Sequence, residues 1–184
     1  MPLAFYRQLI ESTRLRPVFM GQIADDQYSV TLRKWFPDAE IIPSQGIMND
    51  FSMIRSAKNI VVSVSTFSWL AAWLSDAAVV HLPLYGIFNP MQRPDINLIP
   101  LTDSRYRFYD FPVRSWDGSP PQLQALTDDS LFFPMLDSSE VEARLTAARQ
   151  TLRWRLAKYR ATLAWRVFLK RTFGVGGGVI MRMT

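Results

Sequence analysis

The 184-residue sequence contains no cysteine and a single histidine, and both shortages exclude kinds of chemistry. Without cysteine the chain forms no disulfide, holds no metal through thiolates and uses no sulfur nucleophile. With His81 alone, it cannot build a site that needs two imidazoles. The sequence also has neither G-x-G-x-x-G nor G-x-x-x-x-G-K-[ST], so it supports neither a dinucleotide-binding fold nor a P-loop kinase.

Long hydrophobic runs are missing as well. The longest mostly apolar stretch, residues 59–85, is interrupted by serines, an aspartate and His81, so we expect no transmembrane helix. The N-terminus has only Arg7 ahead of Leu9-Ile10, followed by Glu11, which is not the pattern of a secretory signal. We expect a cytoplasmic protein, with peripheral attachment to the inner membrane as an option.

Charge is distributed unevenly along the chain, whose formal net charge is +5. Up to residue 140 there are 11 Lys and Arg against 15 Asp and Glu, a net charge of −4. From Val141 onward, 10 Lys and Arg stand against Glu142 alone, a net charge of +9. An acidic body and a basic tail indicate two different roles. The acidic body and the lack of a recognised binding motif argue against nucleic acid as a partner.

Short apolar runs alternate with helix-like segments over the first half of the chain. We predict strands at residues 17–21, 39–42, 59–64 and 78–82, and helices at residues 3–12, 25–35, 49–56 and 65–74. The third strand is continuously apolar, as expected for a parallel strand covered on both faces. The alternation predicts an α/β fold, a Rossmann-like parallel sheet with helices on both faces.

The second half has a different texture. Residues 85–135 hold seven of the 12 prolines and are predicted to be an ordered loop region with an edge strand at residues 106–109. A long helix should start at Ser138-Ser139-Glu140 and run to about Arg171. We therefore predict a domain at residues 1–135, a basic amphipathic helix at residues 138–172, and a flexible tail at residues 173–184.

The end of the third strand is the best candidate site. Small hydroxyl residues, Ser65 and Thr66, follow the apolar run and open the next helix. The first turn of a helix has free N–H groups, and its dipole favours an anion, so this turn could hold a diphosphate. The carboxyl end of a parallel strand is also where open α/β sheets bind ligands. Taken alone, Ser65 is more simply a helix N-cap.

A longer stretch around this turn resembles a known family. The matching residues are Asp50-Phe51-Ser52-Met53, Asn59-Ile60, and Ser65-Thr66-Phe67-Ser68-Trp69-Leu70-Ala71-Ala72-Trp73-Leu74. They resemble the C-terminal half of the α-1,2-fucosyltransferases and of their bacterial relatives in surface-polysaccharide synthesis. The likeness extends over residues 17–90 and is most specific between Asp50 and Leu74.

The resemblance implies one lobe of a GT-B-like glycosyltransferase that uses a GDP-sugar, inverts the anomeric centre, and needs neither cofactor nor metal. By position, Asp50 would hold the guanine, beside the backbone of Phe51. Ser65, Thr66 and Phe67 would bind the β-phosphate and so stabilise the leaving diphosphate. The acceptor would be a surface glycan or a lipid-linked oligosaccharide. The resemblance assigns no catalytic residue here.

One motif of the family is missing. The relatives carry an upstream His-x-Arg-x-Gly-Asp-like stretch whose arginine meets the pyrophosphate, and this sequence has none. We therefore expect the chain to be the C-terminal portion of a two-lobed enzyme, completed by an N-terminal lobe or a partner chain. Two alternatives remain open: a non-catalytic remnant that keeps the fold, and an adaptor at a membrane surface.

Other residues have simpler interpretations beside the functional ones. Asp50 could be a helix N-cap, as could Asp25 or Asp26. His81 is better explained as a core residue than as a general base. Trp69 and Trp73 fit core packing, and surface roles fit the three arginines of the later loops, Arg93, Arg105 and Arg107.

The C-terminal helix carries an apolar stripe among many cations. The stripe consists of Leu145, Leu152, Leu156, Tyr159 and Leu163. Further aromatic residues are Trp154, Trp165 and Phe168, and the basic residues are Arg149, Arg153, Lys158, Arg160, Arg166, Lys170 and Arg171. We expect the first half of the helix to pack on the domain and the second half to contact an anionic membrane surface.

Overall fold

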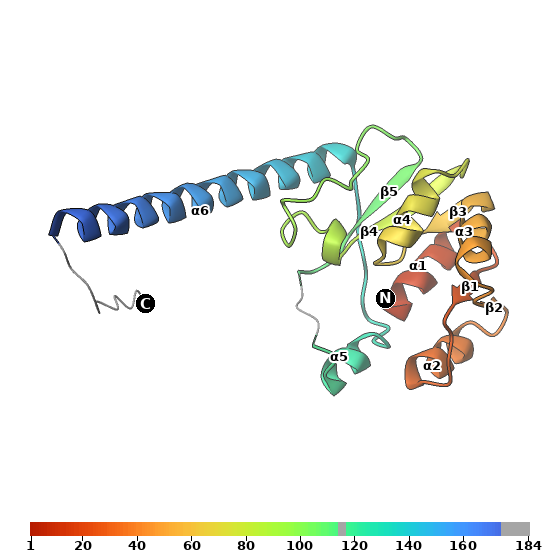
Figure 1. Cartoon of the computed structure of the whole chain (residues 1–184). Helices are drawn as coiled ribbons and strands as arrows, with labels where there is room; N and C mark the ends of the chain where they lie inside the picture. Colours follow the sequence, from red (N-terminus) through yellow and green to blue (C-terminus); the bar gives the residue numbers. More distant parts are fainter. Residues whose placement is uncertain (114–116, 174–184) are drawn as a thin grey trace.

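The protein is a mixed α/β structure with parallel strand pairs and a long C-terminal helix. The computed structural model describes residues 1–113 and 117–173, and the predicted tail after residue 173 lies outside them. The elements are α1 (Leu3–Thr13), β1 (Val18–Gly21), α2 (Gln27–Trp35), β2 (Glu40–Pro43), α3 (Ile47–Ser56), β3 (Asn59–Val61), α4 (Thr66–Trp73), β4 (Val79–Leu84), the 3-10 helix η1 (Gly86–Phe88), β5 (Tyr106–Asp110), α5 (Pro120–Ala125), β6 (Met135–Leu136) and α6 (Ser138–Phe173). Figure 1 shows them along the chain.

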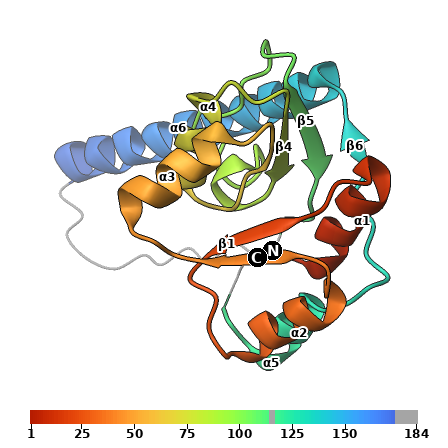
Figure 2. The same ribbon diagram turned by 90° about the vertical axis from the view of Figure 1, so that its right-hand side faces the viewer.

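The strands form two sheets rather than the single sheet predicted. β1 and β2 pair in parallel, and a second sheet has the order β3-β4-β5-β6, parallel except for the β5–β6 pair. Figure 2 shows the β1–β2 pair apart from β4 and β5. A cavity of about 500 Å³ lies between them, lined by Val18, Phe19 and Met20 of β1 and by Ile60 and Val61 of β3.

The third strand is shorter and less covered than predicted. It ends at Val61, although the N–H of Val62 still donates to the carbonyl of His81. The N–H of Ser65 then donates to the carbonyl of Ser63, which turns the chain into α4. Because this turn takes over the last predicted residues, ladder pairing stops early. The strand that is covered on both faces is β4, whose residues from Val80 to Leu84 are all buried.

The proline-rich region is more structured than predicted. It contains η1, β5 and α5, and β5 is an interior strand, not the predicted edge strand. Its outer neighbour is β6, which pairs through Phe108 with Leu136 and through Tyr109 with Met135. β6 could not be predicted from a periodic pattern because the strand is only two residues long.

Two apolar clusters hold the second sheet in place. One surrounds β4 and joins Val62, Val80, Leu82 and Phe108 to Val141 of α6. The other centres on Phe5 of α1, whose ring makes edge contacts with Tyr109, Phe111 and Phe133. Residues from both ends of the chain therefore close the core around β4 and β5.

Only the start of α6 packs on the body. Val141, Leu145 and Ala148 are buried, whereas every residue described from Arg153 to Phe168 is exposed. The helix therefore projects far beyond the sheets, as Figure 1 shows. Within the described ranges, no helix is both long enough and apolar enough to cross a membrane.

Candidate functional site

The turn between β3 and α4 is built by serine hydroxyls. Ser65 is the N-cap of α4, and its hydroxyl accepts from the N–H groups of Phe67 at 3.1 Å and Ser68 at 3.5 Å. The hydroxyl of Ser63 donates to that of Ser68 at 2.8 Å, which adds a hydrogen bond across the turn. The predicted capping role of Ser65 is thus confirmed, and the helix begins with Thr66.

This turn presents the start of α4 to solvent. Thr66 is exposed, and Phe67 is 36% exposed. The exposed first turn offers the backbone N–H and the hydroxyl of Thr66 and the positive end of the helix dipole, because the N–H groups of Phe67 and Ser68 already donate to Ser65. Chemically, the arrangement can receive an anion such as a phosphate group.

Asp50 does not cap α3, because that helix begins earlier than predicted. The N-cap is Gly46, whose φ of 96° suits glycine, and Asp50 lies in the first helical turn. One carboxylate oxygen of Asp50 accepts from the Ser44 hydroxyl at 2.5 Å, and the other accepts from the Gln45 N–H at 2.9 Å. These hydrogen bonds, that of Ser44 first, lower the pKa of Asp50. The carboxylate therefore stays ionised at neutral pH and orders the β2–α3 turn.

The two predicted halves of the site meet through aromatic rings. Phe51 of α3 and Phe67 of α4 make an edge contact with ring centroids 5.6 Å apart. In the described part of the chain, no hydrogen bond joins Asp50 to Ser65 or Thr66. The fold therefore brings α3 beside α4, where Phe51 contacts Phe67 near the start of α4 and Arg55 donates to the carbonyl of Leu74 at its end.

A second loop adjoins the same turn and was missed by the sequence reasoning. Gly86 follows β4 with a φ of +57°, and a Cβ added there would lie 2.8 Å from Cγ1 of Val64. A cavity of about 680 Å³ opens beside these residues, lined also by Tyr85 and Phe111. It lies past the carboxyl ends of β3, β4 and β5. The available signal was Tyr85-Gly86, a glycine directly after a buried strand.

His81 is a buried core residue. Its Nδ1 lies 2.8 Å from the hydroxyl of Tyr109, and the residue is 6% exposed. Burial, and secondarily the positive charge of Arg107, lower the pKa of His81 to about 4. The imidazole is therefore neutral at physiological pH. Its geometry agrees with the core interpretation.

The other polar candidates are engaged within the protein. Asp26 caps α2, accepting from the N–H groups of Tyr28 and Ser29, as predicted for the Asp25-Asp26 pair. The three later arginines are also engaged: Arg93 pairs with Asp95, Arg105 pairs with Asp103 and donates to the carbonyl of Ser75, and Arg107 of β5 donates to the carbonyl of Ser104. In the described ranges, no group of three or more His, Cys, Asp or Glu residues could hold a metal ion.

The two tryptophans of α4 stack on each other. Their rings are 5.8 Å apart and nearly parallel, at 5°. The indole N–H of Trp69 donates to the carbonyl of Leu98 at 2.7 Å, so Trp69 anchors the loop after η1. Trp73 is half exposed, so only Trp69 fits the predicted packing role well.

Comparison with known proteins adds no relative to this picture. No family model, no curated protein and no solved structure matches the chain.

Proposed function

We propose that this chain is the nucleotide-sugar-binding lobe of a glycosyltransferase, a Rossmann-like lobe of the GT-B type that takes a GDP-sugar as donor. The observation that carries the proposal is the contact between Phe51 and Phe67. It joins the Asp50 turn to the Ser65-capped helix, the two segments that resemble fucosyltransferases. A donor spanning both would place its base at α3 and its diphosphate at α4.

The diphosphate would bind at the first turn of α4. Ser65 and Thr66 supply hydroxyl donors there, Thr66 adds its backbone N–H, and the helix dipole favours the negative charge, whereas the N–H of Phe67 already donates to the Ser65 hydroxyl. Charge grows on the diphosphate as the glycosidic bond breaks, so donors aimed at it stabilise the transition state. By the same resemblance, the transfer would invert the anomeric centre and need no metal ion.

Asp50 would recognise the guanine. An ionised carboxylate offers about four lone-pair positions, and Ser44 and Gln45 use one on each oxygen. The remaining positions can accept from the N–H edge of guanine. The turn that holds Asp50 would thus orient it for the base.

The cavity beside Val64 and Gly86 would accommodate the transferred sugar and part of the acceptor. Its volume of about 680 Å³ lies within the usual range of small-molecule sites. The acceptor class proposed is a surface glycan or a lipid-linked oligosaccharide. The pyrophosphate-binding arginine would be supplied by an N-terminal lobe or by a partner chain.

Titration calorimetry with GDP tests the donor site, and two substitutions of Ser65 separate capping from binding. Asp is as good an N-cap as Ser, but its charge would repel a phosphate. We expect Ser65→Asp to keep the thermal stability and to weaken GDP binding by at least roughly tenfold. Ser65→Ala should instead lose about 1 kcal/mol of folding stability. Unchanged GDP affinity in Ser65→Asp, or no GDP binding by the unmodified chain, would refute the proposal.

The guanine contact has a separate test. Asp50→Asn keeps one acceptor oxygen but replaces the other by an amide group that donates. That group cannot accept from the N–H edge of guanine. We expect the preference for GDP over ADP to fall by roughly tenfold or more. Asp26→Asn is the matched control, because Asp26 also accepts from a backbone N–H and a serine hydroxyl but lies at the start of α2. The non-catalytic remnant makes a different prediction. It would bind GDP but transfer no sugar even when a lobe with the pyrophosphate-binding arginine is supplied.

A further inference from the structure

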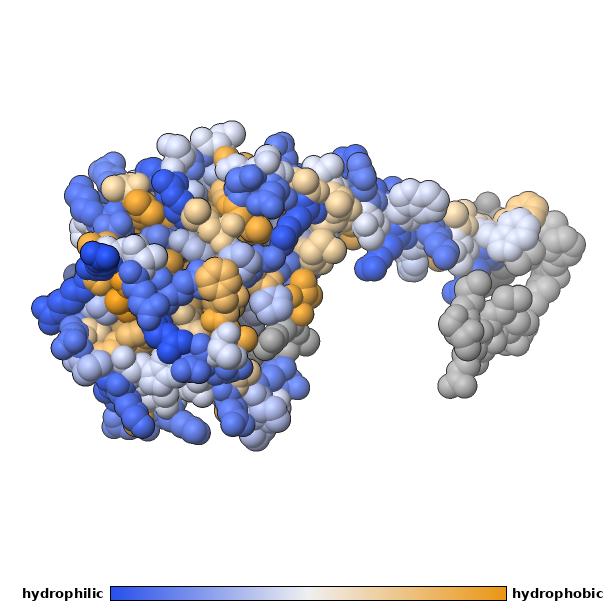
Figure 3. Space-filling view, turned by 180° about the vertical axis from the view of Figure 1, so that it is seen from behind, coloured by the Kyte–Doolittle hydropathy of each residue, from blue (hydrophilic) through white to orange (hydrophobic). Residues whose placement is uncertain are grey.

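The outer part of α6 is exposed on every side. From Arg153 to Phe168 no described side chain is buried, and Trp154, Trp165 and Phe168 are 78%, 60% and 51% exposed. Figure 3 shows this segment standing clear of the body, with hydrophilic and paler side chains along it. A run of exposed aromatic residues on one helix is typical of an interaction surface.

The charge of this segment has one sign. After Glu142 the helix contains no acidic residue, whereas Arg149, Arg153, Arg155, Lys158, Arg160 and Arg166 follow one another. The body up to residue 140 is acidic, with a net charge of −4. An anionic partner would therefore complement the charge of the outer helix, whereas a second copy of the same helix would be repelled.

The apolar residues of α6 form two stripes on opposite sides of the helix. One stripe contains Leu145, Leu156 and Tyr159, and the other contains Trp154, Trp165 and Phe168. Each residue of the second stripe comes nine positions after the corresponding residue of the first. Nine residues make two and a half turns at 3.6 residues per turn, so each pair lies on opposite faces. We call the set with Trp154, Trp165 and Phe168 the aromatic stripe, and the set with Leu145, Leu156 and Tyr159 the leucine stripe, which also includes Leu152 and Leu163.

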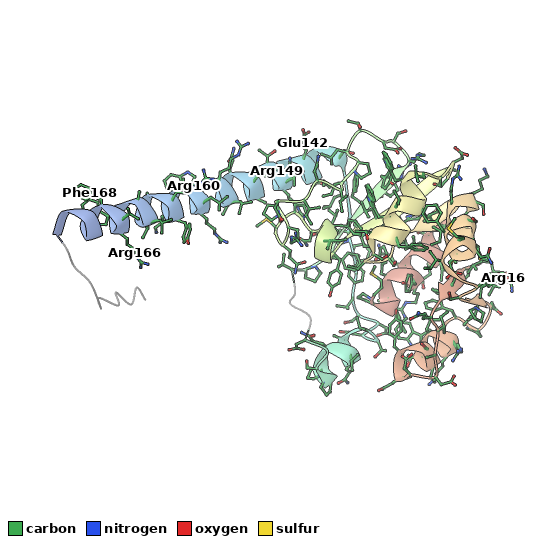
Figure 4. The ribbon with its side chains drawn as sticks, viewed as in Figure 1. Arg16, Glu142, Arg149, Arg160, Arg166 and Phe168 are labelled. Atoms are coloured by element: carbon green, nitrogen blue, oxygen red, sulfur yellow. The ribbon has the colours of Figure 1, made fainter. Side chains whose placement is uncertain are left out.

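The leucine stripe lies on the same side of the helix as the residues that pack on the body at its start. It continues the line of Val141 and Leu145, which are buried against the sheets. A flat surface could not reach this side of the helix without meeting the body. The aromatic stripe points away from the body, and Figure 4 shows Phe168 projecting on the side opposite to Arg166.

The aromatic stripe has the composition of an interfacial face. Small residues, Ala157, Ala161 and Ala164, lie between its aromatic rings, so the rings stand above the helix surface. Trp165 and Phe168 stack with centroids 5.6 Å apart. By helical position, Arg153 and Arg160 border one edge of the stripe and Lys158 borders the other.

We propose that α6 lies along an anionic lipid bilayer with its aromatic stripe against the headgroups. Tryptophan and phenylalanine insert at the boundary between headgroups and acyl chains, while bordering Arg and Lys bind the anionic headgroups. The helix lies on the bilayer and does not cross it, in keeping with the absence of a spanning helix among the described residues. This role is independent of GDP binding.

The aromatic stripe favours a bilayer over a nucleic-acid duplex. Phosphate contacts in a duplex are made by cations and polar donors, and would leave Trp154, Trp165 and Phe168 in water. A bilayer removes those rings from water and neutralises the cations at the same surface. The two partners therefore differ in whether binding depends on the aromatic stripe.

Flotation of the full chain with vesicles tests the proposal. We expect binding to vesicles of mixed phosphatidylcholine and phosphatidylglycerol, and none to phosphatidylcholine alone. A triple variant, Trp154→Ala, Trp165→Ala and Phe168→Ala, should weaken binding by roughly tenfold or more. The matched control changes three exposed residues of the other stripe, Leu156→Ala, Tyr159→Ala and Leu163→Ala, and should bind within about twofold of the unmodified chain.

Three results would overturn the proposal. They are equal loss in the two triple variants, equal binding to neutral and anionic vesicles, and tighter binding to a DNA duplex than to anionic vesicles with no effect of the aromatic variant. Circular dichroism of both variants, with unchanged helix content, ensures that a loss is not unfolding. GDP titration of the aromatic variant should be unchanged, which separates this proposal from the donor site.

Discussion

Single residues at the starts of α4 and α3, Ser65 and Asp50, each form hydrogen bonds within their own turn. The Ser65 hydroxyl accepts from two N–H groups of α4. The two carboxylate oxygens of Asp50 accept from Ser44 and Gln45 in the turn before α3. Such hydrogen bonds orient a side chain as well as stabilise it. A ligand arriving here would therefore meet groups that are already fixed.

Gly86 couples two loops of the site, and this makes a prediction. Gly86→Ala places a side chain at a φ of +57° and 2.8 Å from Val64. We expect a loss of about 2 kcal/mol or more, from left-handed strain together with the clash. Urea denaturation measures it. Gly118→Ala is the control, since Gly118 has a φ of +70° with nothing within 4 Å of the added Cβ.

A double-mutant cycle isolates the contact itself. In a Val64→Ala background the clash is relieved, so Gly86→Ala should cost no more than Gly118→Ala does. If Gly86→Ala costs the same in both backgrounds, then the two loops are not coupled through Val64.

His81 predicts a pH dependence of stability. Its pKa is about 4 in the folded protein against 6.5 for the free side chain, so the unfolded chain binds the extra proton first. The contribution is fully present above pH 6.5 and is lost as the pH falls toward 4. At pH 5 the loss is about 2 kcal/mol. In His81→Asn, the free energy of unfolding measured in urea should fall less between pH 7 and pH 5. An equal fall in both proteins would contradict this prediction.

Among the elements, helices agreed with the sequence better than strands did. The caps at Asp26 and Ser65 were predictable because they depend on residues two or three positions away. The start of α3 was not, because Gly46 displaced the expected cap. Strand burial depends on what packs from elsewhere, and so the doubly covered strand proved to be β4.

The two parts of α6 respond differently to the same substitution. Leu145→Ala empties a position that is 4% exposed, whereas Leu156→Ala changes one that is 47% exposed. We expect the first to lower the free energy of unfolding by about 2–4 kcal/mol and the second by less than about 0.5 kcal/mol. Thermal and urea denaturation measure both. Equal effects would mean that the outer helix also packs on the body.

At the scale of the whole molecule, the two sheets differ in how they are held. β4 is buried and pairs on both sides, whereas β1 and β2 are half-buried to exposed and pair only with each other among the described strands. The cavity between β1 and β3 leaves that boundary without ladder hydrogen bonds. Stability should therefore be lower in the β1–β2 part.

Amide hydrogen exchange tests this difference. We expect the amides of Val80 and Leu82 in β4 to exchange at least roughly tenfold more slowly than those of Phe19 and Met20 in β1. Similar protection of both strands would show that the sheets unfold as one unit.

The sequence by itself determined the α/β alternation, the helix caps at Asp26 and Ser65, the long basic helix and the position of the turn before α4. These features depend on periodicity and on hydrogen bonds between near neighbours, so they can be seen in a few consecutive residues. Only the tertiary structure decided that the sheet divides at β1 and β3, that Phe51 meets Phe67, that Gly86 closes on Val64, and that the aromatic stripe of α6 faces away from the body. Each of these depends on packing between residues far apart in the chain, which no local pattern encodes.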